Sequence, residues 1–218
     1  TVISGCNKPD DNNNGGVTAK VKTHSNTSNS PISGPDTTTS TYIYDSQGRV
    51  SSISTVYLPA GVTTLTTFTY NNNQIIETRE SSIYIYTLNS SGYVTLRFDS
   101  AYGASYSSTV AYTYDASGHR LSAALANSTS GVYFTRYYGW DGDNMTTSTE
   151  NGSYTYTYLT DKANTIGNAN VGMSFYGKDS KNLINTSVNS GSTTTYFYDY
   201  DSQNRVIRVN GKDTYTYY

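Results

Sequence analysis

Tyr42-Ile43-Tyr44-Asp45-Ser46-Gln47-Gly48-Arg49-Val50 is the stretch that decides the fold. It returns near the end of the chain as Tyr198-Asp199-Tyr200-Asp201-Ser202-Gln203-Asn204-Arg205-Val206. A third copy, Tyr112-Thr113-Tyr114-Asp115-Ala116-Ser117-Gly118-His119-Arg120-Leu121, has one additional residue before the apolar position that Leu121 is expected to fill. Weaker copies bring the total to about seven units, and such self-similarity predicts a repeat architecture. These weaker copies begin at Phe68, Tyr84, Tyr137 and Tyr154.

Each unit predicts a strand, a tight turn and a second strand. Two tyrosines two residues apart lie on the same face of a strand, because side chains alternate with period two. The Asp or Asn that follows opens a turn, since its side chain can accept a backbone N–H. Three residues later comes Gly48, Gly92, Gly118 or Asn204, where the chain is expected to pass through positive φ. Chained units of this kind make an antiparallel meander.

The composition gives the shape of this meander. The chain has 218 residues, of which 24 are tyrosine and only 35% are hydrophobic. Aliphatic side chains are too sparse for two tightly packed sheets, whereas Tyr and Thr supply stabilising cross-strand pairs. We therefore expect an all-β fold, an elongated and curled sheet of about seven hairpins whose inner face is filled by tyrosines. Residues 161–183 break the pattern and are expected to be a long loop or short helix that covers one edge or end.

The repeat resembles the YD repeat, whose core reads YxYDxxGR followed by an aliphatic residue. Such repeats occur in teneurins, Rhs proteins and Tc toxins. The chain is most similar to short YD-repeat lipoproteins of Bacteroidota, a domain family of unknown function, and the resemblance covers roughly residues 40 to 218. It implies a β fold and a cell-surface address. It supplies no catalytic residues.

The N-terminus predicts a lipid anchor. Thr1-Val2-Ile3-Ser4-Gly5-Cys6 resembles the lipobox of bacterial lipoproteins, in which the signal peptide is cut ahead of a cysteine that then carries the lipid. Residues 1–6 are accordingly expected to end a signal peptide, with Cys6 as the lipid attachment site at an outer membrane, facing the cell surface. Residues 7–39 are rich in Asn, Ser, Thr and Gly and are expected to form a flexible tether. Residues 40–218 are the predicted β domain.

Charge and apolar content exclude two other classes of protein. The formal net charge is −2 and the chain has no basic run, so few cations are available to neutralise phosphates and no nucleic-acid partner is expected. No run of about 20 apolar residues occurs, which excludes a transmembrane helix. The strand faces that alternate with tyrosine hold Thr, Ser and Asp, which are unsuited to contact with lipid, so contact with a membrane is expected through the N-terminal lipid only. Cys6 is the only cysteine, which excludes a disulfide or a cysteine-based zinc site within the chain.

Candidate catalytic and metal-binding groups have structural explanations. Asp199 and Asp201 are spaced as two carboxylates on one strand face, but Asp201 opens a turn. His24 lies in the tether and His119 follows a turn glycine, which gives little support to a metal site or a Ser-His-Asp arrangement. Asp141-Gly142-Asp143-Asn144 resembles the opening of an EF-hand loop without its closing acidic residue. We expect no enzyme, cofactor or metal site, and a glycan-active hydrolase is the alternative.

Aromatic residues supply the remaining signal for function. Phe134, Tyr137 and Tyr138 crowd the only tryptophan, Trp140, directly before a predicted turn. Rigid aromatic rings often anchor recognition sites, so these four residues could form a stacking platform for a glycan or a cell-surface protein. The competing interpretation is that the rings pack in the core. The function expected is a non-catalytic, surface-tethered lipoprotein module with a binding or envelope role.

Overall fold

The computed structural model describes residues 19–30, 34–101, 107–127, 131–149 and 152–218. Within these ranges the chain forms one 17-stranded sheet and one short 3-10 helix, η1 (Ser174–Tyr176). The ladders between named strands are all antiparallel. The predicted all-β antiparallel fold is therefore confirmed. No helix of this part of the chain is long and apolar enough to cross a membrane.

The strands are β1 (Val21–Ser30), β2 (Gly34–Tyr44), β3 (Val50–Leu58), β4 (Val62–Asn71), β5 (Gln74–Arg79), β6 (Ser82–Leu88), β7 (Val94–Ala101), β8 (Ser107–Tyr114), β9 (Arg120–Asn127), β10 (Gly131–Asp141), β11 (Asn144–Thr149), β12 (Ser153–Ala163), β13 (Asn182–Asn189), β14 (Ser192–Thr195), β15 (Tyr198–Tyr200), β16 (Val206–Val209) and β17 (Asp213–Tyr217).

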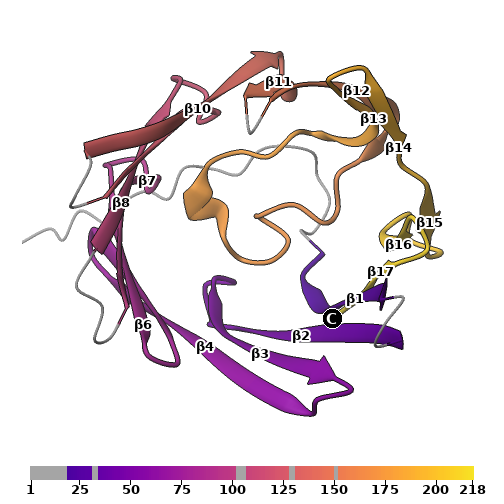
Figure 1. The fold of residues 1–218 in the computed structure, drawn as a ribbon, viewed down its shortest axis with the longest axis horizontal. Coiled ribbons are helices and arrows are strands. Elements are labelled where there is room, and N and C mark those ends of the chain that lie inside the picture. Colours follow the sequence, from indigo (N-terminus) through magenta and orange to yellow (C-terminus); the bar gives the residue numbers. More distant parts are fainter. Residues whose placement is uncertain (1–18, 31–33, 102–106, 128–130, 150–151) are drawn as a thin grey trace, which may run out of the picture.

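The strands pair in sequence order, as expected for a meander. Consecutive strands pair from β2 to β14 and again from β15 to β17. The first strand, β1, pairs with both β17 and β2 and so lies between the last strand and the second. Figure 1 shows the result: the sheet curls so that its strands stand around a central space.

The turns have the geometry that the repeat predicts. In the first copy, Asp45 Oδ1 accepts hydrogen bonds from the backbone N–H groups of Gln47 at 2.9 Å and Arg49 at 3.0 Å. Arg49 Nε also donates to Asp45 Oδ2 at 2.7 Å. Gly48 has a φ of 72°, and Asn204, which takes its place in the last copy, has a φ of 58°. The side chain of the turn-opening residue and the left-handed residue thus fix each hairpin.

Tyrosines fill the inner face of the sheet. In β12 the half-buried rings of Tyr154 and Tyr156 stack at 6.3 Å, while Thr155 and Thr157 between and after them are exposed. The largest fully buried side chains are those of Tyr86, Ile75, Val21, Val50, Val94 and Val206. The expected core of tyrosines with aliphatic residues at intervals is therefore present.

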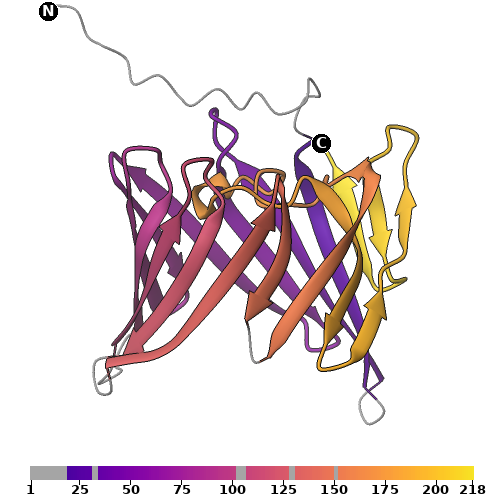
Figure 2. The ribbon, with the colours of Figure 1, turned by 90° about the horizontal axis from the view of Figure 1, so that it is seen from above.

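Residues 164–181, which we call the crossing segment, lie inside the ring of strands near one rim (Figures 1 and 2). The backbone N–H of Asn164 bonds to Lys181 O at 2.8 Å and closes the segment at its base. Further along, Gly172 O accepts from Val50 N at 3.1 Å, and Phe175 is buried against Tyr86. The loop predicted over residues 161–183 thus covers one end of the sheet, with η1 as its only helical turn in the described chain.

The ordered domain begins earlier than the sequence predicts. Residues 7–39 are a predicted tether, yet Val21–Ser30 form β1 and β2 begins at Gly34. This part of the chain has few apolar residues, but β1 gains a ladder of backbone hydrogen bonds on each side, from β17 and β2. Val21 is fully buried, and Thr23 Oγ1 lies 2.7 Å from Thr216 Oγ1. The predicted boundary at residue 40 is therefore too late.

Candidate functional site

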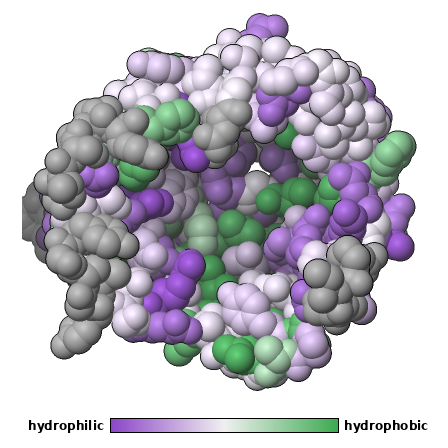
Figure 3. All heavy atoms as spheres, in the orientation of Figure 1, coloured by the Kyte–Doolittle hydropathy of each residue, from purple (hydrophilic) through white to green (hydrophobic). Residues whose placement is uncertain are grey.

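A cavity of about 350 Å³ lies between the crossing segment and the inner face of the sheet. Figure 3 shows this face of the molecule hollowed at its centre, with hydrophobic and hydrophilic residues both present around the hollow. The cavity is lined from β9, β10, β11, β13 and β15 and from the crossing segment. Its volume is within the range of small-molecule sites, about 300–1,000 Å³. Charged residues among its lining are Arg120, Lys178 and Asp179.

Arg120 enters the cavity because it occupies a position that other turns give to valine. Val50 pairs with Tyr44, Val94 with Leu88 and Val206 with Tyr200 directly after their turns. All three valines are fully buried. The equivalent residue after the third turn is Arg120, which pairs with Tyr114.

The alignment of this turn corrects the prediction for Leu121. The Asp115 turn has the same length as the Asp45 turn, since Gly118 N bonds to Asp115 O at 3.1 Å as Gly48 N bonds to Asp45 O at 3.0 Å. His119 therefore takes the arginine position of the motif, and Arg120 takes the apolar one. Leu121, predicted to be the apolar residue of the repeat, is 39% exposed.

The guanidinium of Arg120 lies over aromatic rings and has spare hydrogen-bonding capacity. Its central carbon is 4.7 Å from the centroid of Tyr138 and 5.9 Å from that of Tyr112, distances at which a cation is attracted to a ring face. Arg120 Nε is buried and has no hydrogen-bond partner among the residues that the structure describes. Buried polar groups are normally paired. An arginine held in this way can bind an anion.

Trp140 forms the wall beside Arg120. Its indole Nε1–H donates to Arg120 O at 2.9 Å, and its ring stacks on His119 with centroids 4.4 Å apart. His119 is 4% exposed, and its Nδ1 lies 2.9 Å from Asp115 Oδ2. The turn of the third repeat therefore fixes the orientation of the Trp140 ring through His119.

Asp179 supplies the negative charge at the cavity. Asn168 holds the carboxylate with its backbone N–H on Oδ2 and with its side-chain amide on Oδ1 at 2.8 Å. Burial raises the pKa of Asp179 to about 6, against the opposing effect of backbone N–H groups and of the charge on Arg120. The carboxyl group therefore changes its charge in the mildly acidic range. No ion pair joins it to Arg120 in the described chain.

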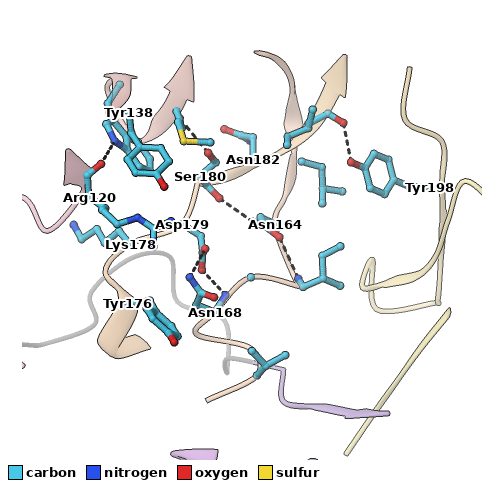
Figure 4. A pocket seen from close by; sticks show the side chains of 17 residues that line it. Arg120, Tyr138, Asn164, Asn168, Tyr176, Lys178, Asp179, Ser180, Asn182 and Tyr198 are labelled. Carbon is cyan, nitrogen blue, oxygen red and sulfur yellow. Dashed lines mark hydrogen bonds between the residues drawn. The ribbon is translucent and has the colours of Figure 1, made fainter. Parts of the chain in front are cut away.

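The remaining wall is held in place by hydrogen bonds. Asn164 Nδ2 donates to Ser180 O at 3.1 Å, and Asn182 Nδ2 donates to Thr160 O at 3.0 Å. Tyr198 on the far side donates to Ile184 O at 2.8 Å. Figure 4 shows Arg120, Lys178, Asp179 and Tyr138 on one side of the cavity and Tyr198 on the other. The cavity is thus preformed, with charge on one side.

The structure separates the four aromatic residues of the predicted platform. Trp140 and Tyr138 line the cavity. Tyr137 is 61% exposed and is not among the lining residues, since it alternates with Tyr138 along β10. Phe134 does not line the cavity either, and Arg136 lies over its ring at 5.6 Å. The predicted lipid attachment site, Cys6, lies outside the described residues.

Sequence reasoning missed Arg120, Lys178 and Asp179. One signal was present for Arg120: an arginine stands where the other close copies of the repeat have valine. No local pattern marks Lys178 and Asp179, because they reach the cavity through the path of the crossing segment.

Gly142, Asp199 and Asp201 are in the turn and strand positions that the structural interpretations predict, whereas His24 lies in β1 and not in a tether, with its Nε2 3.0 Å from Asp213 Oδ1. Gly142 has a φ of 55° in the turn between β10 and β11, and no cluster of metal-ligating side chains occurs in the described ranges. Asp201 opens its turn, accepting from Gln203 N at 2.9 Å. Asp199 pairs with Arg208 Nε at 2.8 Å. Neither aspartate lines the cavity.

A similar fold occurs in a porin-like protein from Bacteroides uniformis. Its crystal structure superposes with a TM-score of 0.72 at 17% sequence identity, covering 93% of this chain and 98% of that one. At this identity the likeness extends to the fold alone. No protein-family model matches the sequence, and no curated protein matches it.

Proposed function

We propose that this protein is a non-catalytic module of the bacterial envelope that binds a small ligand in the cavity beside the crossing segment. The observation that carries the proposal is the placement of Arg120 in a position that the fold otherwise gives to buried valine. Arg120 is half-buried, and its buried Nε has no hydrogen-bond partner in the described chain. Buried polar groups are normally paired, so this unpaired donor supports the presence of a ligand. Trp140 and Tyr138 add aromatic surface at the same place.

The alternative, a glycan-active hydrolase, has less support. Glycoside hydrolysis commonly uses two carboxyl groups that flank the scissile bond, about 5–5.5 Å or 6.5–9.5 Å apart. Among the lining residues of the cavity only Asp179 carries a carboxyl group. The two aspartates that the sequence suggests have other roles: Asp199 forms an ion pair with Arg208, and Asp201 opens a turn. Binding without catalysis is therefore the function that the site supports best.

The envelope assignment rests on the sequence. The lipobox-like Ile3-Ser4-Gly5-Cys6 supports a lipid anchor, and the YxYDxxGR copies support kinship with the YD-repeat lipoproteins of Bacteroidota. The fold of the Bacteroides protein is compatible with that kinship. In this proposal a lipid on Cys6 holds the domain at the cell surface.

Labelled palmitate tests the anchor. In cells that make the protein with its leader, the label should enter the parent and not Cys6→Ser, which should be released from the membrane fraction. Label in the Cys6→Ser protein would show that this cysteine is not the anchor.

Neighbouring tyrosines allow a matched test of the cavity. Tyr138 lines it, whereas Tyr137 is exposed outside it. The full chain is first screened against mono- and disaccharides and small organic acids. A ligand found in this way should bind Tyr138→Leu at least tenfold more weakly in calorimetry and should bind Tyr137→Leu with unchanged affinity. Equal losses in both variants, or a loss in Tyr137→Leu alone, would place the binding elsewhere. Absence of binding across the whole panel would reject a small-molecule role.

A further inference from the structure

The charged side of the cavity indicates the chemistry of its ligand. Arg120 and Lys178 are the two cations that line it, and neither forms an ion pair with any residue of the described chain. Asp179 is the single acidic residue of the lining, and Asn168 already donates to both of its oxygens. The charged groups of this wall that have no ion-pair partner in the described chain are thus both cationic donors.

The position of Arg120 favours an anion that offers two oxygens side by side. The guanidinium presents N–H groups in a fixed fork that matches a carboxylate or phosphate. Tyr138 on β10 limits its position from one side, and burial of Nε removes the water that would otherwise satisfy it. A guanidinium restrained in this way loses little further side-chain entropy when it binds.

Asp179 decides between the two anions. A ligand bound at Arg120 shares the cavity with this carboxyl group, so each added negative charge on the ligand meets more repulsion. A carboxylate carries one charge and a phosphate monoester nearly two at neutral pH. The monoanion is therefore the better fit. The cavity volume of about 350 Å³ limits the ligand to a small molecule.

We infer that the cavity recognises a small ligand through a carboxylate, bound by Arg120 with the support of Lys178, and that Trp140 and Tyr138 contact the body of the ligand. This inference rests on the proposed function and deepens it by naming the ligand class. Sugar acids are the simplest molecules that combine a carboxylate with a ring able to pack on aromatic side chains.

Calorimetry with matched sugar pairs tests the inference on the full chain. The probes are D-glucuronate with D-glucose, D-galacturonate with D-galactose, and D-glucose 6-phosphate as the phosphate arm. At least one sugar acid should bind at least tenfold more tightly than its neutral partner and more tightly than the phosphate. Neutral members that bind as well as the acids, or tighter binding of the phosphate, would overturn the carboxylate assignment while leaving a cavity ligand in place.

The variant Arg120→Val separates binding from folding. It restores the residue that the other turns carry at this position, so the protein should fold with at least the thermal stability of the parent. Binding of the sugar acid should fall at least tenfold. Arg208→Met, which removes an exposed guanidinium paired with Asp199, should leave binding unchanged.

Two results with these variants would reject the role of Arg120. One is an unchanged dissociation constant for the sugar acid in Arg120→Val. The other is an equal loss of affinity in Arg120→Val and Arg208→Met. If no sugar acid binds while the wider screen finds an uncharged ligand sensitive to Tyr138→Leu, the carboxylate inference fails and the proposed function stands.

Discussion

The ring of His119 lies almost parallel to the indole of Trp140, with centroids 4.4 Å apart and planes 18° apart. His119 belongs to the turn of the third repeat, and Trp140 to the wall of the cavity. The two interpretations that the sequence leaves open for Trp140, core packing and ligand contact, are therefore compatible. Packing on His119 orients the ring that lines the cavity.

Replacing Trp140 should lower stability as well as binding. Trp140→Ala removes the contact with His119 and the hydrogen bond to Arg120 O, and should reduce the free energy of unfolding by about 2–4 kcal/mol. Trp140→Phe keeps a ring against His119 and should lose only about 1 kcal/mol, the value of the hydrogen bond. Urea unfolding measures both. An unchanged Trp140→Ala protein would show that the ring does not contribute to packing.

The left-handed residue of the last repeat makes a prediction about turn chemistry. Asn204 has a φ of 58°, a conformation that Gly adopts freely and β-branched residues resist. Asn204→Gly should be neutral or slightly stabilising, and Asn204→Val should destabilise by about 1–2 kcal/mol. Thermal unfolding compares the two. Equal melting temperatures for Asn204→Val and the parent would show that this turn tolerates either residue.

The crossing segment should depend on the absence of a side chain at Gly172. A Cβ there would meet Val50 N at 2.5 Å and Tyr44 Cε1 at 2.9 Å, and the φ is 74°. Gly61 has a similar φ of 67° but nothing within 4 Å of an added Cβ, so Gly61→Ala serves as the control for backbone strain alone. Gly172→Ala should lose about 1–3 kcal/mol more stability than Gly61→Ala, because the segment must shift away from β3. Equal losses in chemical denaturation would contradict this close contact.

Asp179 should make stability depend on pH in the mildly acidic range. Burial raises the pKa of its carboxyl group from 3.8 to about 6 in the folded protein. Between pH 3.8 and about 6 the carboxyl group of Asp179 holds a proton in the folded state that it has lost in the unfolded state. The stabilisation is therefore complete below pH 4 and disappears as the pH rises through 6, a difference of up to about 3 kcal/mol.

Asp179→Asn isolates this contribution. The aspartates of the repeat turns, Asp45 and Asp115, have lowered pKa values because hydrogen bonds and ion pairs within the turns outweigh the effect of burial. Their contributions are lost only below about pH 4. Urea unfolding between pH 4.5 and 7 should therefore show a decline in stability for the parent that Asp179→Asn lacks. Parallel curves for the two proteins would contradict the raised pKa of Asp179.

The fold could be predicted because its signals are local. The Asp45 turn and its copies fix each hairpin by contacts within five residues, and alternation then places the tyrosines inside. The strand β1 could not be predicted well, because its stability comes from β17 and β2, which are distant in sequence or similarly polar. Short sequence patterns therefore predict the turns better than they predict which strands pair.

The cavity depends on contacts that no local pattern records. Asn170 O bonds to Val21 N at 3.0 Å and Lys178 N to Gly118 O at 2.9 Å, and these contacts set the path of the crossing segment. They bring Asp179 to the same cavity as Arg120, although the two residues are far apart in the sequence. The sequence shows an arginine, Arg120, at a position where the other close copies of the repeat have valine. Only the pairing of Arg120 with Tyr114 shows that its side chain takes the inward position of those valines.

The emission of Trp140 is the most direct measurement of whether a ligand enters the cavity. It is the only tryptophan in the chain and lines the cavity beside Arg120, so its fluorescence reports on this site without a label. Titration with a ligand that calorimetry identifies should change the emission of the full chain with the same dissociation constant, and in Tyr138→Leu the change should require at least tenfold more ligand. Saturable binding in calorimetry with no change in Trp140 emission would contradict the central claim that the cavity is the binding site.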